Sequence, residues 1–393
     1  MKYNFDEIVD RRGTDCLKYD GMAQFYGSDD NLPMWVADMD FRTPDFILEA
    51  LKKRLEHPVL GYFNHTERFR QAISSWVLRR HNWRIDNDWI LFSPGVVPAL
   101  AAIVLAFTEP NDKIIVQPPV YHPFFYVVEN QSRKIIENPL KLDGENYLFD
   151  FEDLEMKLKE GAKLLILSNP HNPVGRCWKP EELRKLSEMC LAYNCIVVSD
   201  EIHSDLMING NRHTVTASLS PEIACNTITC MAPSKTFNMA GLSTSEIIVS
   251  NEGYREKINH VLTDGIHIHC GNIFGDIGLI AAYENGDEWL AQLLDYLTEN
   301  VNYAKRFIKE KLPVLKTFNH EATYLLWVDF SDCGLTHAEL TQKLVGEAHL
   351  ALNDGSIFGR GGAKHFRINF ACPKSTVTEA LIRLEKTFSK YNP

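Results

Sequence analysis

The sequence predicts an α/β fold in which a large domain, with a mostly parallel mixed sheet between helices, is joined to a small α+β domain formed by both chain ends. Three observations support this prediction. Short apolar segments alternate with amphipathic ones through the middle of the chain, several of them are almost continuous in Val, Ile and Leu, and the alternation stops in the last third. Strands buried on both faces of a largely parallel sheet have this composition.

Six short apolar segments are expected to form the strands of the large domain. They are residues 89–93, 113–117, 164–168, 196–199, 227–231 and 246–250. Helix-like segments lie between them. Residues 181–193 are one example, because Pro180 precedes them at a position that suits a first helical turn.

The last third of the chain predicts a different arrangement. Residues 287–311 keep a helical spacing of apolar side chains, which predicts a helix long enough to cross between two domains. Strand-like residues 324–329 and 366–370 lie on either side of a helical segment at 338–347. The expected division is a large domain over residues 44–288 and a small domain made of residues 1–43 and 289–393.

Composition limits the classes of function. The 393 residues are 45% hydrophobic and 24% charged, as in ordinary globular proteins, and the formal net charge is -11. An acidic balance repels phosphate backbones and anionic lipid, so nucleic acid and membrane surfaces are poor partners. The nine cysteines include no C-x-x-C pair, and no apolar run approaches the roughly 20 residues of a membrane-spanning helix. We expect a soluble, cytoplasmic protein without a signal peptide.

Lys235 follows one of the predicted buried strands, in the segment S-K-T-F-N that begins at Ser234. A lysine at such a place more commonly marks the exit of a strand at the surface. A buried lysine, by contrast, loses its proton readily and becomes a nucleophile toward carbonyl groups. Lys235 is therefore a candidate catalytic amine.

Asp200 ends another apolar run, in S-D-E-I-H, with His203 three residues later. Ligands of open α/β sheets lie beyond the carboxyl ends of the strands, where a carboxylate can hold a cationic ring nitrogen. A helix N-cap is an equally good interpretation of this segment alone. Asp200 and His203 could also suggest a metal, but no third ligand has convincing spacing, so we predict no metal site.

Two turns and one arginine complete the candidate set. Residues 168–175 contain two Asn-Pro steps, and their restricted backbone can hold the Asn172 amide over a ligand, although a plain turn is the simpler interpretation. Gly95 precedes a helical segment whose first N–H groups suit a phosphate. Arg367 interrupts a strand pattern, where a guanidinium either faces water at an edge or binds a substrate carboxylate.

Together these groups fit one cofactor. They are a phosphate site at a helix start, an amine, an acid for a ring nitrogen, an amide for a ring hydroxyl and a clamp for a carboxylate. Pyridoxal 5'-phosphate (PLP) needs this set when it acts on an amino acid. The sequence therefore predicts a PLP site with a small amino-acid substrate.

The order of the motifs resembles that of the fold-type I PLP-dependent enzymes. The class I/II aminotransferase superfamily shares the succession G-V-V-P-A-L, N-P-H-N-P-V-G, S-D-E-I-H-S-D-L, A-P-S-K-T-F-N and R-I-N-F-A-C-P. The early segment P-M-W-V-A-D-M-D-F, residues 33–41, is typical of the MalY/PatB branch of cystathionine β-lyases, which are C–S lyases. The resemblance extends from about residue 3 to the end of the chain.

The resemblance implies a role for individual residues. Lys235 would hold the cofactor covalently and act as the base, Asp200 would pair with the ring nitrogen, and Tyr121 would stack on the ring. The other cofactor contacts that it implies are Gly95, Val96, Val97, Asn172, His203 and Ser234. The implied substrate contacts are Arg367, Val36, Ala37 and Asn172. Tyr62 would reach the phosphate of the neighbouring subunit, which implies a homodimer.

Two positions depart from the family pattern. Ser243 stands where many aminotransferases have an arginine for the phosphate, and Glu246 stands where relatives often have a bulkier residue. The expected reaction is removal of the α-proton of L-cystathionine or a related S-substituted cysteine, followed by β-elimination to a thiol, pyruvate and ammonia. Transamination uses the same base and is an alternative, and a regulatory protein-binding role on the same fold is another.

Overall fold

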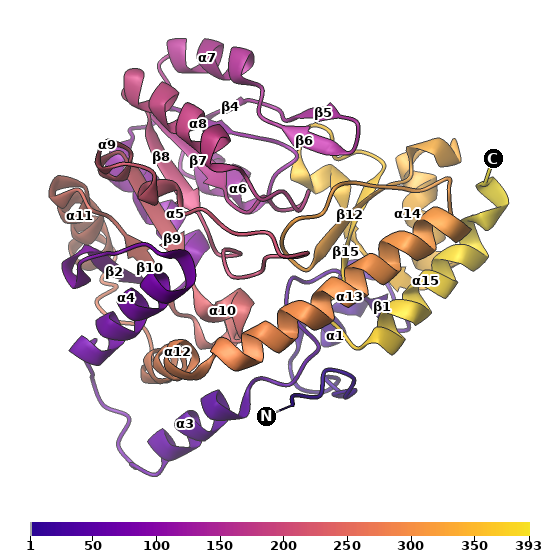
Figure 1. The fold of residues 1–393 in the computed structure, drawn as a ribbon, viewed down its shortest axis with the longest axis horizontal. Coiled ribbons are helices and arrows are strands. Elements are labelled where there is room, and N and C mark those ends of the chain that lie inside the picture. Colours follow the sequence, from indigo (N-terminus) through magenta and orange to yellow (C-terminus); the bar gives the residue numbers. More distant parts are fainter. Residues whose placement is uncertain (1) are drawn as a thin grey trace.

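A seven-stranded sheet forms the centre of the computed structural model, which describes residues 2–393 (Figure 1). Its strand order is β2-β10-β9-β8-β7-β3-β4. The strands are β2 (Ile90–Ser93), β3 (Lys113–Val116), β4 (Lys134–Glu137), β7 (Leu164–Ser168), β8 (Ile196–Asp200), β9 (Thr227–Met231) and β10 (Ser245–Ile248). β10 runs antiparallel to both of its neighbours and the other pairs are parallel, so the predicted mostly parallel mixed sheet is confirmed.

Alternate residues of the central strands face two different layers of helices. Val198 of β8 packs with α5 (Val96–Phe107), α6 (Pro123–Glu129) and α11 (Glu252–Asn259) on one face. Val197 packs with α7 (Phe151–Lys159) and α8 (Pro180–Ala192) on the other face. Because both faces are covered, β7 and β9 are buried at every residue, and β7 is apolar at every position before Ser168.

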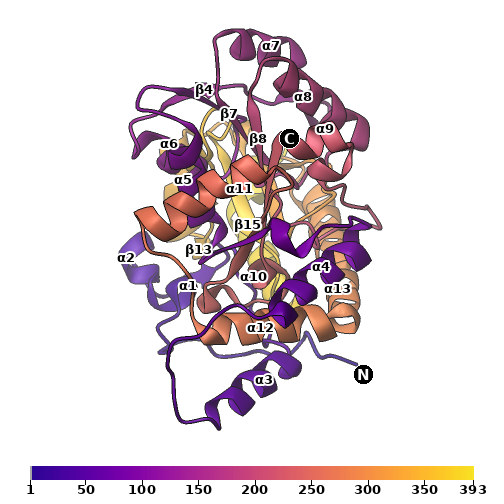
Figure 2. The same cartoon turned by 90° about the vertical axis from the view of Figure 1, so that its left-hand side faces the viewer.

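The β2 end of the sheet is covered by helices from two distant parts of the chain. α12 (Ile273–Asn285) packs against α3 (Asp45–Leu55) and α4 (Glu67–His81), as Figure 2 shows. The short helices α9 (Pro221–Cys225) and α10 (Pro233–Thr236) lie on either side of β9 along the chain. None of the described helices combines the length and the apolar composition that crossing a bilayer requires.

A second, four-stranded sheet carries the C-terminal part of the chain. Its order is β11-β12-β15-β14, and all its pairs are antiparallel. Its strands are β11 (Lys316–Thr317), β12 (Leu325–Asp329), β14 (Asn353–Asp354) and β15 (His365–Asn369), with helices α14 (His337–Gly346) and α15 (Lys374–Phe388). A separate small hairpin consists of β5 (Lys141–Asp143) and β6 (Asn146–Leu148).

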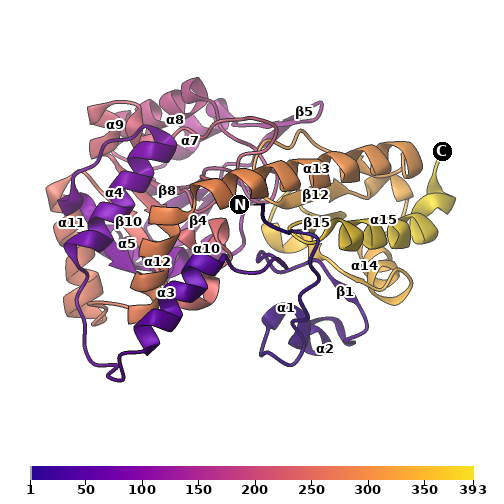
Figure 3. The same ribbon diagram turned by 60° about the horizontal axis from the view of Figure 1, so that its bottom comes forward.

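Both chain ends meet at this second sheet. β1 (Leu32–Pro33) pairs in parallel with β13 (Leu350–Ala351), and the N-terminal helices α1 (Leu17–Asp20) and α2 (Met22–Tyr26) lie nearby (Figure 3). The 25-residue helix α13 (Asp287–Lys311) runs from the large sheet to the small one. The domain boundaries at residues 44 and 288 stay a prediction.

Most of the predicted elements begin and end within one or two residues of the observed ones. The features that were not predicted from the sequence include β4 and the elements before Pro44. β4 is an edge strand whose charged ends hide its short apolar centre. The segment before Pro44, which has few regular signals, contains α1, α2 and β1.

Candidate functional site

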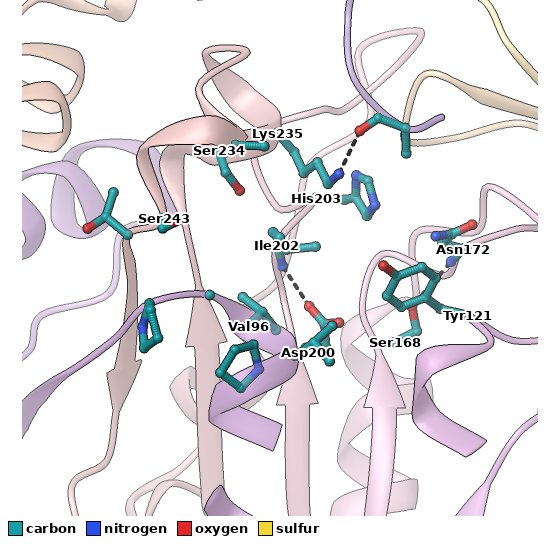
Figure 4. Close-up of a pocket in the computed structure, with 17 residues that line it drawn as sticks. Val96, Tyr121, Ser168, Asn172, Asp200, Ile202, His203, Ser234, Lys235 and Ser243 are labelled. Carbon is teal, nitrogen blue, oxygen red and sulfur yellow. Dashed lines mark hydrogen bonds between the residues drawn. The ribbon is translucent and has the colours of Figure 1, made fainter. Parts of the chain in front are cut away.

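A cavity of about 200 Å³ opens at the carboxyl ends of β7 and β8, beside the segment that follows β9 (Figure 4). These strands are parallel neighbours, and the last residues of two of them, Ser168 and Asp200, are paired in register. Side chains from motifs that are far apart in the sequence therefore line the same cavity. The predicted site residues that line it are Ala37, Gly95, Val96, Val97, Tyr121, Asn172, Asp200, His203, Ser234 and Lys235.

Lys235 projects into the cavity from α10, directly after β9. Its Nζ donates a hydrogen bond to the carbonyl oxygen of Ala37 at 2.6 Å. Burial lowers the pKa of Lys235 to about 8, although Asp38 and Asp200 act in the opposite direction. The amine therefore loses its proton far more easily than an exposed lysine does, as a nucleophile or base requires.

Asp200 ends β8 and is 5% exposed. Its Oδ1 accepts one hydrogen bond, from the backbone N–H of Ile202 at 3.1 Å. Burial raises the pKa of Asp200 to about 7 and outweighs the favourable charge of Lys235. Such an acid is stabilised as a carboxylate by any cationic group that enters the cavity.

The opposite end of the cavity is a cradle of N–H groups and hydroxyls. α5 begins there, and no side chain caps its first N–H groups, which follow Gly95. Ser234, Ser243 and Thr244 line the same wall, and the Thr244 hydroxyl is buried without a partner. A helix N-terminus with hydroxyls around it binds a phosphate. The sequence analysis did not identify Thr244, whose signal is the run of hydroxyl residues S-T-S, residues 243–245, which ends at the first residue of β10.

Arg367 lies behind this cavity, on β15 of the small sheet. Its Nη1 donates to Asn172 Oδ1 at 2.9 Å and its Nη2 donates to the Trp35 carbonyl at 3.0 Å, whereas Nε is buried without a partner. Burial lowers the pKa of Arg367 to about 10, so the guanidinium stays cationic at neutral pH. It is a fixed cation, and no carboxylate is among its hydrogen-bond partners.

A second cavity of about 740 Å³ continues from the first. The two share Ala37, Tyr121 and Lys235, and the second one adds Val36 and Arg367. Every predicted site residue except one therefore lines a single connected space. The exception is Tyr62, which is fully exposed between α3 and α4 and lines neither cavity.

The residues of the smaller cavity fit PLP. The buried acid Asp200 suits a protonated ring nitrogen, the buried amine of Lys235 suits an aldehyde, and the unpartnered hydroxyl of Thr244 lines the phosphate cradle. His203 is neutral, because burial holds its pKa well below the usual range, and its Nδ1 has no partner. Fold and site together define the class of fold-type I PLP-dependent proteins.

The chain belongs to the family described as aminotransferase class I and II, whose model matches residues 32–384. Cystathionine beta-lyase PatB of Bacillus subtilis (strain 168) is 45% identical over 387 residues, covering 98% of this chain and 100% of the relative. The resemblance to the MalY/PatB branch is thereby confirmed.

Two solved structures are similar over nearly the whole chain. A PLP-bound protein of Clostridium difficile 630, provisionally described as an aminotransferase, has a TM-score of 0.97 and 46% identity and covers 98% of this chain and 100% of its own. The PLP-bound C-S lyase of Staphylococcus hominis has a TM-score of 0.92 and 32% identity, covering 99% of this chain and 98% of its own. These matches confirm the predicted fold type.

Proposed function

We propose that this protein is a PLP-dependent carbon–sulfur β-lyase that cleaves L-cystathionine or related S-substituted cysteines. One observation carries the proposal: the amine of Lys235 and the guanidinium of Arg367 line one connected space that also holds the acid Asp200. An amino acid whose α-carboxylate binds Arg367 would present its Cα to Lys235. The similarity to a cystathionine beta-lyase supports the choice of reaction.

PLP, when bound, supplies an aromatic ring that accepts electrons from the α-carbon of an amino acid. Lys235 would hold it, Asp200 would keep its ring nitrogen protonated, and the α5 N-terminus with Ser234 and Thr244 would hold its phosphate. Tyr121 would pack on the ring and Asn172 would donate to the ring hydroxyl. These assignments stay predictions.

Two groups of the chain act directly on the substrate in this proposal. Arg367 fixes the α-carboxylate by charge and hydrogen bonds. Lys235 removes the proton from Cα, for which its lowered pKa suits it. The Cβ–S bond then breaks, sulfur keeps the electron pair and takes up a proton as a thiol, and one water converts the remaining fragment to pyruvate and ammonia.

The proposal also includes a homodimeric state and a cytoplasmic location. Tyr62 is completely exposed, and its apolar neighbours Val59 and Leu60 are 60% and 61% exposed. An exposed apolar segment of this kind suits burial against a second copy of the chain, so we propose a homodimer in which Tyr62 completes the partner's phosphate site. All nine cysteines are free, which agrees with the proposed cytoplasmic location.

The deciding experiment incubates the purified holoenzyme with L-cystathionine in the absence of any 2-oxo acid. Thiol and pyruvate released in equal amounts over many turnovers are expected from a lyase. Release that requires an added 2-oxo acid would identify an aminotransferase instead, the alternative favoured by the description of the Clostridium difficile relative. A Lys235→Gln variant is the control and should be inactive in both assays.

A further inference from the structure

A buried cluster of two histidines and two acids adjoins the candidate site but lines neither cavity. The members of this His–acid cluster are Glu201, His213, His81 and Asp205, and none of their side chains is more than 5% exposed. Glu201 directly follows Asp200 in the sequence. The proposed reaction gives the cluster no role, although titratable groups are costly to bury unless they are paired.

Glu201 forms one end of the cluster. Its Oε1 accepts hydrogen bonds from the Ser199 hydroxyl at 2.8 Å and from the Thr216 N–H at 3.0 Å, and its Oε2 lies 2.7 Å from His213 Nε2. Burial lowers the pKa of His213, although Glu201 acts in the opposite direction, so the ring is neutral at neutral pH and donates its one N–H to this carboxylate. Three hydrogen bonds therefore hold the side chain next to Asp200.

His81 and Asp205 form the other end of the cluster. The rings of His213 and His81 meet edge to face with centroids 5.4 Å apart, and His81 Nε2 lies 3.3 Å from Asp205 Oδ1. The partly exposed Arg80 places its Nε 3.6 Å from the same oxygen. Burial acts to raise the pKa of Asp205, but His81, Arg80 and a hydrogen bond hold that pKa below its usual range, so this acid is a carboxylate at neutral pH.

The two ends of the cluster reach the sequence neighbours of the two candidate catalytic residues. Glu201 follows Asp200, which ends β8. The second oxygen of Asp205 accepts a hydrogen bond at 3.0 Å from the hydroxyl of Thr236, which follows Lys235 in α10. Moving any member of such a buried network leaves a polar partner unpaired, so the members keep one arrangement.

We propose that His213 is a positioning residue of the reaction. Through Glu201 it holds the end of β8, and through His81 it fixes the acid that anchors α10. The placements of Asp200 and Lys235 are thereby coupled. The proposal rests on the proposed function and adds to it a group that touches neither substrate nor cofactor.

His213→Gln and His213→Asn are a matched pair of variants. The longer amide can place its N–H where the imidazole Nε2 lies and donate to Glu201, whereas the shorter amide cannot reach. In the holoenzyme with L-cystathionine, His213→Asn should lower kcat about tenfold with little change in KM, and His213→Gln should stay within about threefold of the wild type. Equal kcat values in the two variants would overturn the role of this contact.

His320→Asn is the control. It removes a buried imidazole outside the cluster, which contacts the Thr323 carbonyl at 3.1 Å, and it should leave kcat unchanged. If His213→Asn does not fold, His81→Asn breaks the cluster at its other ring, with His81→Gln as the matched partner, and the same results are expected.

A double-mutant cycle tests whether the cluster joins its two ends. Thr236→Val breaks the contact to Asp205 beside Lys235. In one coupled network, adding His213→Asn to Thr236→Val should lower kcat by less than about threefold more, whereas independent sites would multiply to a loss of about a hundredfold. A multiplied loss would show that the two ends act separately and would refute the coupling.

The absorbance of bound PLP as a function of pH separates this proposal from the lyase function, because it needs bound cofactor but no turnover. The midpoint of this titration should move by about half a pH unit in His213→Asn and in Thr236→Val, and should stay in place in His320→Asn. An unchanged midpoint in all three variants would count against the coupling whatever the substrate is. Shifted midpoints in a protein whose wild type releases no thiol or pyruvate would support the coupling and refute the lyase function.

Discussion

The Nζ of Lys235 lies 2.6 Å from the carbonyl oxygen of Ala37, which also accepts a hydrogen bond from the Tyr324 hydroxyl at 3.0 Å. The N-terminal segment that carries this carbonyl is held in turn by the C-terminal strand. The Asn369 side-chain amide donates to the carbonyls of Val36 and Asp38, and both contacts are short. The candidate catalytic amine is thus positioned by both chain ends.

Asn369→Ala removes this connection and should lower kcat/KM at least tenfold. The buried amide makes two hydrogen bonds to residues 36–38, and their loss costs about 1–3 kcal/mol each while freeing the segment that faces Lys235. Steady-state kinetics, with the PLP content measured in parallel, check the outcome. Asn302→Ala alters an exposed asparagine and is the matched control. A variant with normal kinetics would show that the segment does not need this amide.

Thr236→Val should lower kcat about tenfold with little change in KM. The Thr236 hydroxyl donates to Asp205 at 3.0 Å, and the same carboxylate oxygen accepts from Trp76 at 3.1 Å. Asp205 thereby fixes the four-residue helix α10, which is too short to be stable by itself, beside Lys235.

Thr236→Ser distinguishes positioning from bulk stability. It keeps the hydroxyl and should restore kcat to within twofold of the wild type. The absorbance of bound PLP as a function of pH gives a second measurement, since it responds to the placement of Lys235. A loss of kcat that serine does not restore would argue against a positioning role for the hydroxyl.

Glu246 should make the protein less stable as the pH rises through the neutral range. Burial raises the pKa of Glu246 to about 8, and Tyr283 donates to it at 2.6 Å. The folded state therefore binds a proton that the unfolded chain has lost, from about pH 4.5 to 8, and the free energy of unfolding falls across this window by about 5 kcal/mol.

Glu246→Gln lacks this titration and serves as the reference. Urea unfolding of both proteins from pH 5 to pH 9 should show the wild type losing stability relative to the variant. If the free energies of unfolding of the wild type and the variant changed with pH in the same way, Glu246 would be ionised throughout this range and its charge would be compensated in the folded state.

Arg367→Ala should raise KM for cysteine thioethers about 100-fold, because a charge-assisted clamp on a carboxylate is worth about 3 kcal/mol. The bound PLP should keep its colour, since Arg367 lies beyond the smaller cavity. Kinetics and the visible spectrum check both points. Arg383→Ala, at an arginine on the outer helix α15, is the control. Loss of colour in Arg367→Ala would place this residue in the cofactor site.

Much of the fold could be predicted because every strand of the large sheet except β4 is a separate, largely apolar run with polar residues after it. Asp200 and Lys235 were found for the same reason, since both follow such runs. The antiparallel direction of β10 could not be predicted, because an apolar run carries no information about its direction.

Contacts between segments that are distant in the sequence could not be predicted either. The bond from Lys235 to Ala37 joins residues 198 positions apart, and the bond from Arg367 to Asn172 joins residues 195 positions apart. Neither follows from local spacing, since both depend on how the small sheet sits beside the large one. Thr244 escaped notice because a hydroxyl run is common in loops.

The pairing of β1 with β13 has a consequence for synthesis of the chain. A ribosome completes Lys235, Asp200 and the whole central sheet well before β15 emerges with Arg367. Until then the segment around Ala37 lacks the hydrogen bonds that Tyr324 and Asn369 make to it. Nascent and prematurely terminated chains can therefore form the central sheet, which carries Lys235 and Asp200, and still lack Arg367, which binds the substrate carboxylate in the proposed function. We therefore expect activity only after translation is finished.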